Sequence, residues 1–212
     1  MLSSFQYFVD EFKRRTDSCG TAIQLVQMVT ETFPSFQDET WLDGRKGDFA
    51  VLAITVYIWK RAQILVAETW AAFYPPNTDM VHPIFPGPAG PVIGELTMFA
   101  DYRVPQILHH LRILTYPQAL KETLEAGLPL ISGSREEISI RTTSIVAVER
   151  LREEIIHLRR NQQLVEGQEV SSVLIDFYLW DLAKDIESGN QKIEGIKTRT
   201  IIPPHRTRSI WY

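Results

Sequence analysis

The sequence predicts an all-α fold, with at most a minor β element, and three observations support this prediction. Apolar residues recur at spacings of three and four over most of the chain, which is the pattern of amphipathic helices. Ser134-Arg-Glu-Glu137 has the form of a capping box, in which a serine and a glutamate three residues later satisfy the first N–H groups of a helix. Six of the 12 prolines collect in one segment, 74–94, between the periodic segments.

Residues 1–73 are expected to form an N-terminal helical segment. In the first helix Phe5, Phe8 and Phe12 share one face, and Pro34 ends the second. Helices are expected over 3–16, 21–33 and 60–73, with a polar turn over 40–47. The run 48–59 is atypically apolar, lacks clean alternation and is rich in β-branched residues, so it is interpreted as either a buried strand or a helix segment.

Residues 74–95 are rich in proline and glycine and are predicted to form a loop, the best candidate for a domain boundary or a mobile lid. Residues 96–212 are expected to form a helical core that carries the chemistry. Its helices are expected over 104–114, 117–126, 135–160 and 171–187, and a polar tail over 188–212. The longest helix should turn six apolar residues inward: Ile138, Ile145, Val148, Leu151, Ile155 and Leu158. The charges around its start are expected on the surface: Arg135, Glu136, Glu137 and Arg141.

The net charge of −4 argues against broad binding to nucleic acid or to anionic membranes, because phosphate backbones need a basic face. A single nucleotide remains a suitable ligand, since one or two placed cations are enough for one phosphate. Cys19 is the only cysteine, so no internal disulfide and no cysteine-based zinc site is expected, and a reducing, intracellular location such as the cytoplasm fits. The longest apolar run is far shorter than the ~20 residues that a membrane span needs.

Asp101 is the first candidate for chemistry. It lies between Phe99 and Tyr102 and directly before the helix in which Pro105 suits the first turn. A carboxylate in such an apolar setting is suited to stabilise the positive charge that develops on a sugar when a glycosidic bond breaks. The alternative is a helix N-terminal acid that satisfies free N–H groups, and from the residues alone this is the commoner case.

A second candidate cluster is Ile175-Asp-Phe-Tyr-Leu-Trp-Asp181. On a helix, Asp176 and Asp181 are separated by roughly 140°, so both can border one pocket that Phe177 and the other aromatics help to wall. One carboxylate can accept two N–H groups of a guanine-like edge, and the other can pair with an ammonium group. The alternative is an amphipathic helix whose two acids face water.

Lys60 is the third candidate, because a cation at a helix start opposes the helix dipole. It is therefore either tolerated at the surface or placed for a partner such as a phosphate or Asp101. His109, His110 and His205 show no metal-ligand spacing, and no nucleotide-binding glycine pattern occurs, so neither a metal nor a cofactor is expected.

Several strings in this order resemble the queuosine salvage proteins, the queuosine 5′-phosphate N-glycosylases. They are Lys60-Arg-Ala-Gln-Ile-Leu-Val-Ala67 with Trp70, Leu96-Thr-Met-Phe-Ala-Asp-Tyr-Arg-Val-Pro-Gln106, Ser132-Gly-Ser-Arg-Glu-Glu137 with Ile140-Arg141, Ile175–Asp181, and Pro204-His-Arg206. The resemblance implies a helical architecture similar to that of DNA glycosylases. It also implies release of queuine from queuosine 5′-monophosphate, for reuse in transfer RNA modification.

By that resemblance Asp101 is the nucleophile or the transition-state stabiliser, and Lys60 supports the site. Phe99, Asp176, Phe177 and Asp181 are implied to contact the base. Queuine is a 7-deazaguanine and has no N7 to protonate. Catalysis must therefore depend more on stabilising the sugar cation and on holding the base by its edge.

Members of the family carry a long helical first half before the matched region, so the chain is expected to correspond to the C-terminal portion of such a protein. The alternative to an N-glycosylase is a catalytically inactive helical fragment or binding module of the same family. A DNA-repair glycosylase is a third hypothesis, and the acidic pI of about 5.8 speaks against it.

Overall fold

The computed structural model describes residues 4–42, 54–74, 80–85, 93–162, 170–189, 193 and 195–212. This part of the chain is mostly helical with small strands, which confirms the predicted fold class. The α-helices are α1 (Ser4–Arg15), α2 (Ala22–Thr32), α3 (Lys60–Ala72), α4 (Arg103–His110), α5 (Gln118–Glu125), α6 (Arg135–Asn161) and α7 (Ser172–Glu187). Two single 3-10 turns are η1 (Pro34–Phe36) and η2 (Ile93–Glu95). The strands are β1 (Glu39–Leu42), β2 (Ile54–Tyr57), β3 (Pro129–Leu130) and β4 (Arg206–Thr207).

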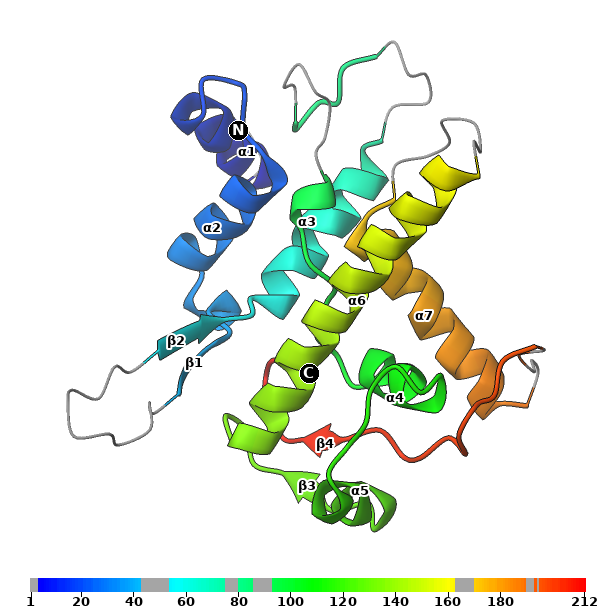
Figure 1. Ribbon diagram of the computed structural model, residues 1–212. Helices are drawn as coiled ribbons and strands as arrows, with labels where there is room; N and C mark the ends of the chain where they lie inside the picture. The colour runs from blue at the N-terminus through cyan, green and yellow to red at the C-terminus, as the bar shows by residue number, and fades with distance from the viewer. Residues whose placement is uncertain are drawn as a thin grey trace, which may run out of the picture.

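The helices pack around two main apolar cores. Figure 1 shows α1 and α2 on one side, α4, α6 and α7 on the other, and α3 between them. The first core joins α1, α2 and α3 and includes Phe12, Val26 and Val66. The second lies among α4, α6 and α7 and includes Ile107 and Val148. The candidate residues lie on the elements that connect these two cores.

The segment predicted as a loop contributes to the first core. Ile84 and Phe85 are buried in it, and the buried ring of His82 accepts hydrogen bonds at Nδ1 from the N–H groups of both residues, each at 3.2 Å. Residues 75–79 and 86–92 lie outside the described part of the chain. The division of the chain at 74–95 therefore stays a prediction.

The strands explain the ambiguous apolar run. β1 pairs antiparallel with β2, with Glu39 opposite Tyr57, so residues 54–57 form a strand, and the start of the predicted polar turn at Thr40 is also in a strand. Residues 43–53 lie outside the described part. Beyond β2 the chain turns inward at Ile58, which is buried.

The parallel pairing of β3 with β4 returns the C-terminal segment to the body of the protein. In Figure 1 this segment, drawn in red, passes below α4 and ends beside α6. The N–H of Arg199 donates to the carbonyl of His110 at 2.8 Å, which fixes the same segment to the end of α4. The residues predicted as a polar tail therefore include an ordered part of the fold.

Helix α6 corrects part of the predicted inward face. Ile138 and Val148 are buried as predicted, whereas Leu158 is 47% exposed because the end of the helix extends beyond the packed cores. The predicted capping box is half formed. Ser134 Oγ accepts from the N–H of Glu137 at 3.3 Å, but the Glu137 carboxylate accepts from the N–H of Gly133 instead of from that of Ser134. No helix in the described part of the chain is long and apolar enough to span a membrane.

Candidate active site

Asp101 lies directly before α4 and is buried. Its Oδ1 accepts from the N–H groups of Arg103 at 2.9 Å and Val104 at 3.0 Å, so it satisfies the N–H groups at the helix start as one interpretation predicted. Its Oδ2 has no hydrogen-bond partner among the described residues. One oxygen therefore fixes the carboxylate and the other is left for a ligand.

Asp176 fixes the backbone on the N-terminal side of Asp101. This buried residue of α7 accepts from the N–H of Phe99 through Oδ2 at 2.8 Å, while its Oδ1 is unpaired in the described part. The ring of Phe177 meets that of Phe99 edge to face, with 5.7 Å between ring centres. The structure thus brings together Asp101, Phe99, Asp176 and Phe177 from two segments far apart in the sequence.

Lys60 is the first residue of α3 and is buried, not tolerated at the surface. The preceding Trp59 has a φ of +48°, which is uncommon for a bulky residue. Asp38 stabilises this change of backbone direction at the start of α3. Its backbone carbonyl accepts from the N–H groups of Ile58 and Trp59, and its Oδ2 accepts from the N–H of Lys60 at 3.3 Å.

Arg141 corrects the prediction that it and Glu137 are surface charges. The side chain of Arg141 is 2% exposed and that of Glu137 1%, because the face of α6 that carries them turns inward against Asp38. The Arg141 guanidinium forms a two-nitrogen ion pair with Asp38 and contacts Glu137 Oε1 at 3.3 Å. Its Nε donates to the carbonyl of Ala100 at 3.2 Å, so it fixes the residue before Asp101. Arg135 and Glu136 are exposed as predicted.

All six buried Asp, Glu, Lys and Arg residues of the described chain belong to one cluster. They are Asp38, Lys60, Asp101, Glu137, Arg141 and Asp176. Four acids and two bases give the cluster an excess of negative charge when all are ionised. Such an excess, placed away from water, favours a cation or a developing positive charge.

Three polar atoms of this cluster make no hydrogen bond in the described chain: Asp101 Oδ2, Asp176 Oδ1 and Lys60 Nζ. None of them is among the buried unpaired atoms, so each remains in contact with solvent-accessible space. Burial opposes charge in all three side chains. It raises the pKa of Asp101, lowers the pKa of Lys60, and together with the charge of Asp101 raises the pKa of Asp176 to about 7. Charged groups that make no hydrogen bond and remain open to solvent are what a bound ligand would contact.

The model of one protein family, the queuosine salvage proteins, matches the chain over residues 1–212. The chain belongs to the queuosine salvage protein family. Relatives named queuosine 5′-phosphate N-glycosylase/hydrolase include one from Sphaerobacter thermophilus, 35% identical over 97% of this chain and 52% of its own length. Those from Bos taurus and Schizosaccharomyces pombe are 35% and 36% identical over 91% and 90% of this chain. They are matched over 48% and 47% of their own lengths, so the chain spans about half the length of the curated relatives it matches.

Asp181 differs from the other residues that the family resemblance implicated. It is exposed on α7, and its side chain makes no hydrogen bond or ion pair with any described residue. Arg103, which also faces α7, is instead paired with Glu187 at 2.7 Å and lies 5.6 Å from the centre of the Trp180 ring. A contact between Asp181 and the base therefore stays a prediction.

A second group was not predicted from the sequence. Tyr212 donates its hydroxyl hydrogen to Glu137 Oε1 at 2.6 Å, and the buried His205 lies with Nε2 3.0 Å from the same hydroxyl oxygen. Since that hydroxyl has only one hydrogen, His205 must donate from Nε2. Asp38 carried no signal in the sequence, whereas Glu137 and Arg141, four residues apart on a predicted helix, were a detectable pair.

His205 gives a testable pH dependence. Burial, with the positive charges of Arg141 and Lys60, lowers its pKa to about 4 from the ordinary 6.5. The unfolded chain then binds a proton more readily than the folded one between these values, so this residue makes the fold less stable as the pH falls from 6.5 to 4. We expect up to about 3 kcal/mol of the free energy of unfolding to be lost in this way.

Chemical denaturation of wild type and His205→Gln at pH 7 and pH 4 measures this contribution. The comparison between the two proteins is needed because Asp176, with its raised pKa, adds stability as the pH falls over an overlapping range. The difference in unfolding free energy should move in favour of His205→Gln at pH 4. A difference that is the same at both pH values would contradict the buried, neutral state of His205.

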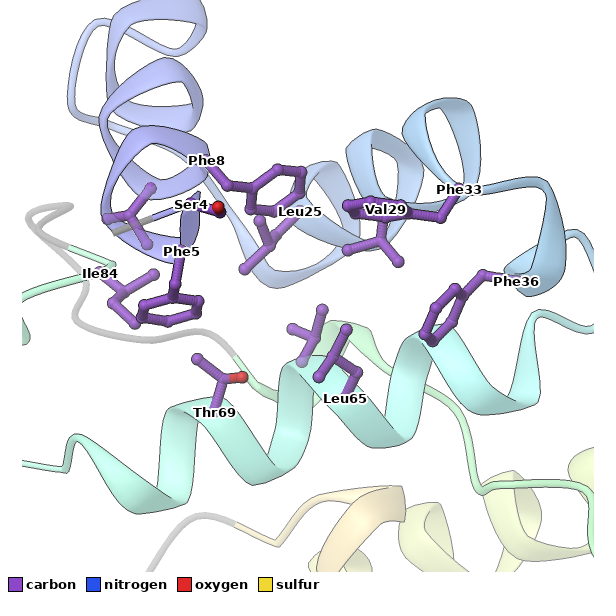
Figure 2. A pocket seen from close by; sticks show the side chains of 12 residues that line it. Ser4, Phe5, Phe8, Leu25, Val29, Phe33, Phe36, Leu65, Thr69 and Ile84 are labelled. Atoms are coloured by element: carbon purple, nitrogen blue, oxygen red, sulfur yellow. The ribbon is translucent and has the colours of Figure 1, made fainter. Parts of the chain in front are cut away.

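An apolar cavity of about 340 Å³ lies apart from the charged cluster, between α1, α2 and α3. Figure 2 shows Phe5, Phe8, Phe33 and Phe36 around it, and among the described lining residues Ser4 and Thr69 carry the hydroxyl groups. None of the described residues that line it has a titratable side chain. This cavity therefore cannot supply acid, base or charge stabilisation, and the charged cluster remains the candidate site.

Proposed function

We propose that the chain hydrolyses the N-glycosidic bond of queuosine 5′-phosphate and releases queuine. The observation that supports this most is the gathering of every buried Asp, Glu, Lys and Arg of the described chain into the cluster that contains Asp101, in a member of the queuosine salvage family. The relatives carry this activity in their name, and the chain spans about half of their length. The partner is a small-molecule nucleotide, and a nucleotide substrate fits an intracellular, cytoplasmic location.

The reaction breaks the bond between the sugar C1′ and the base nitrogen. The electron pair of that bond leaves with queuine, positive charge develops on the sugar, and water supplies a hydroxyl to C1′ and a proton to the base. We propose that the unpaired Oδ2 of Asp101 faces this charge, either as stabiliser or as nucleophile. The N–H groups of Arg103 and Val104 oppose the rise in its pKa and so favour its ionised form.

The base is proposed to lie against Phe99 and Phe177, with its edge toward the unpaired Oδ1 of Asp176. Ionised Asp176 accepts N–H groups that a 7-deazaguanine presents on this edge. Lys60 supports the site as a cation beside Asp101, where the opposite charges of Asp101, Asp38 and Asp176 counter the fall in its pKa.

The test is to incubate the purified 212-residue chain with queuosine 5′-phosphate and to measure free queuine by mass spectrometry. Release of queuine with multiple turnovers supports the proposed activity. Binding of queuine without turnover would instead make the chain a binding module, which is the alternative that remains from the sequence. Queuosine without its phosphate serves as the comparison substrate.

Replacing Asp176 with Asn is expected to weaken queuine binding by about 10–100-fold, because a charged hydrogen-bond partner is typically worth about 1.5–3 kcal/mol. Asparagine keeps an oxygen for the N–H of Phe99, so the chain before Asp101 stays in place. Calorimetry of the variant and of a matched Asp181→Asn variant measures the change. If both bind as tightly as wild type, the acids of α7 take no part in base recognition.

A further inference from the structure

The segment 205–212 is tied to the body of the protein at two places near its ends. β4 is paired with β3 at one end, and at the other the carbonyl of Ile210 accepts from the Arg61 guanidinium at 3.3 Å. Since Arg61 is on α3, next to Lys60, the segment ends beside the candidate site. Tyr212 is the residue of this segment whose side chain lies at the candidate site.

The ring of Tyr212 lies against both buried cations of the cluster. Lys60 Nζ is 5.2 Å from the ring centre and Arg141 Cζ is 5.1 Å from it, both within the range of a cation–π interaction. Arg141 also has two carboxylates as partners, Asp38 and Glu137. Lys60 Nζ makes no hydrogen bond or ion pair with any described residue, and its cation–π partner is the ring of Tyr212.

This arrangement matters because an ion pair between Lys60 and Asp101 would neutralise the charge that Asp101 needs. An aromatic ring stabilises an ammonium group without removing its N–H donors. We infer that Tyr212 is a positioning residue, whose ring holds the Lys60 ammonium beside Asp101 and whose hydroxyl fixes Glu137 and Arg141 behind Ala100. The effect on catalysis rests on the proposed function, whereas the effect on Lys60 does not.

The alternative is that Tyr212 only fills space and anchors the end of the chain. The two explanations differ in what happens at Lys60, which is faced by Asp101, Asp38 and Asp176 as opposite charges and by Arg141 as a like charge. A space-filling role predicts lower stability with no specific change at that amine. A positioning role predicts that removal of the ring changes the titration of Lys60 and that removal of the hydroxyl alone does not.

NMR titration of the lysine side chains tests this without any need for activity, with the Lys60 signal assigned by its absence in Lys60→Arg. In wild type we expect the Lys60 methylene protons next to Nζ to be shifted upfield by the ring. In Tyr212→Leu we expect the titration midpoint of Lys60 to fall by about 0.5–1 pH unit, from the usual strength of a cation–π contact. Tyr212→Phe and the exposed control Ile210→Ala should keep the wild-type midpoint.

An unshifted Lys60 signal in wild type would overturn the inference even if Tyr212→Leu failed to fold. A titration midpoint that is the same in Tyr212→Leu as in Tyr212→Phe would also overturn it.

Kinetics add a second measurement. Tyr212→Leu should lower kcat for queuosine 5′-phosphate about 3–20-fold with little change in KM. In a Lys60→Met background it should cause no further loss, and an equal loss in both backgrounds would contradict action through Lys60. If no queuine is released by wild type, the proposed function fails, and the NMR titration still decides the role of Tyr212.

Discussion

Asp101→Asn is expected to lower queuine release by about 10²–10³-fold in kcat, since the loss of one group that stabilises transition-state charge commonly has an effect of this size. The fold should survive, because the asparagine oxygen can still accept from the N–H groups of Arg103 and Val104. The measurement is single-turnover queuine release, with circular dichroism and thermal melting to verify the fold.

Asp185→Asn is the matched control for this change, because it removes one negative charge from an exposed position of α7. It should leave kcat within about twofold of wild type, as exposed charges are strongly screened. Turnover of Asp101→Asn at the wild-type rate would show that the charge of Asp101 does not act on the sugar. The assignment of Asp101 would then have to be withdrawn.

Arg141→Met is expected to destabilise the protein by about 3–5 kcal/mol, which is the usual cost of removing one partner from a buried ion pair. The substitution leaves Asp38 and Glu137 buried together without their shared cation, and it removes the donor to the carbonyl of Ala100. Methionine fills much of the same volume, so the loss of charge and hydrogen bonds dominates the effect. Urea denaturation at pH 7 gives the free energy of unfolding.

Arg135→Met provides the comparison on the same helix, because Arg135 is exposed and forms no ion pair with any described residue. Its unfolding free energy should stay within about 0.5 kcal/mol of wild type. If Arg141→Met lost less than about 1 kcal/mol, the buried network would not be stabilised by this cation. A second variant, Asp38→Asn, should share part of the loss and should be non-additive with Arg141→Met, because the two side chains are in contact.

The sequence was sufficient for features that depend on local spacing. Helix spacing predicted the seven helices of the described chain to within a few residues, because the period of a buried face is visible in a linear sequence. The string around Asp101 also contained its own signal, since an acid before a helix with proline in its first turn is a local arrangement. Where the signal was mixed, as in the apolar run before Lys60, the choice of a strand depended on pairing with β1.

Tertiary structure alone decided which charges are buried and which face water. The i, i+4 spacing of Glu137 and Arg141 predicts a pair but not its burial, which follows because Arg141 meets Asp38 from more than one hundred residues away, whereas Arg135 stays exposed. In the same way Tyr212 belongs to a segment predicted as a polar tail, and the pairing of β4 with β3 helps to bring its ring to Lys60. A charge is tolerated in the interior only when a partner of opposite sign or a hydrogen bond reaches it. In this protein those partners come from distant segments. The sequence therefore specifies the helices and indicates Asp101 as the candidate acid, and the packing of the helices determines the electrostatic environment of that acid.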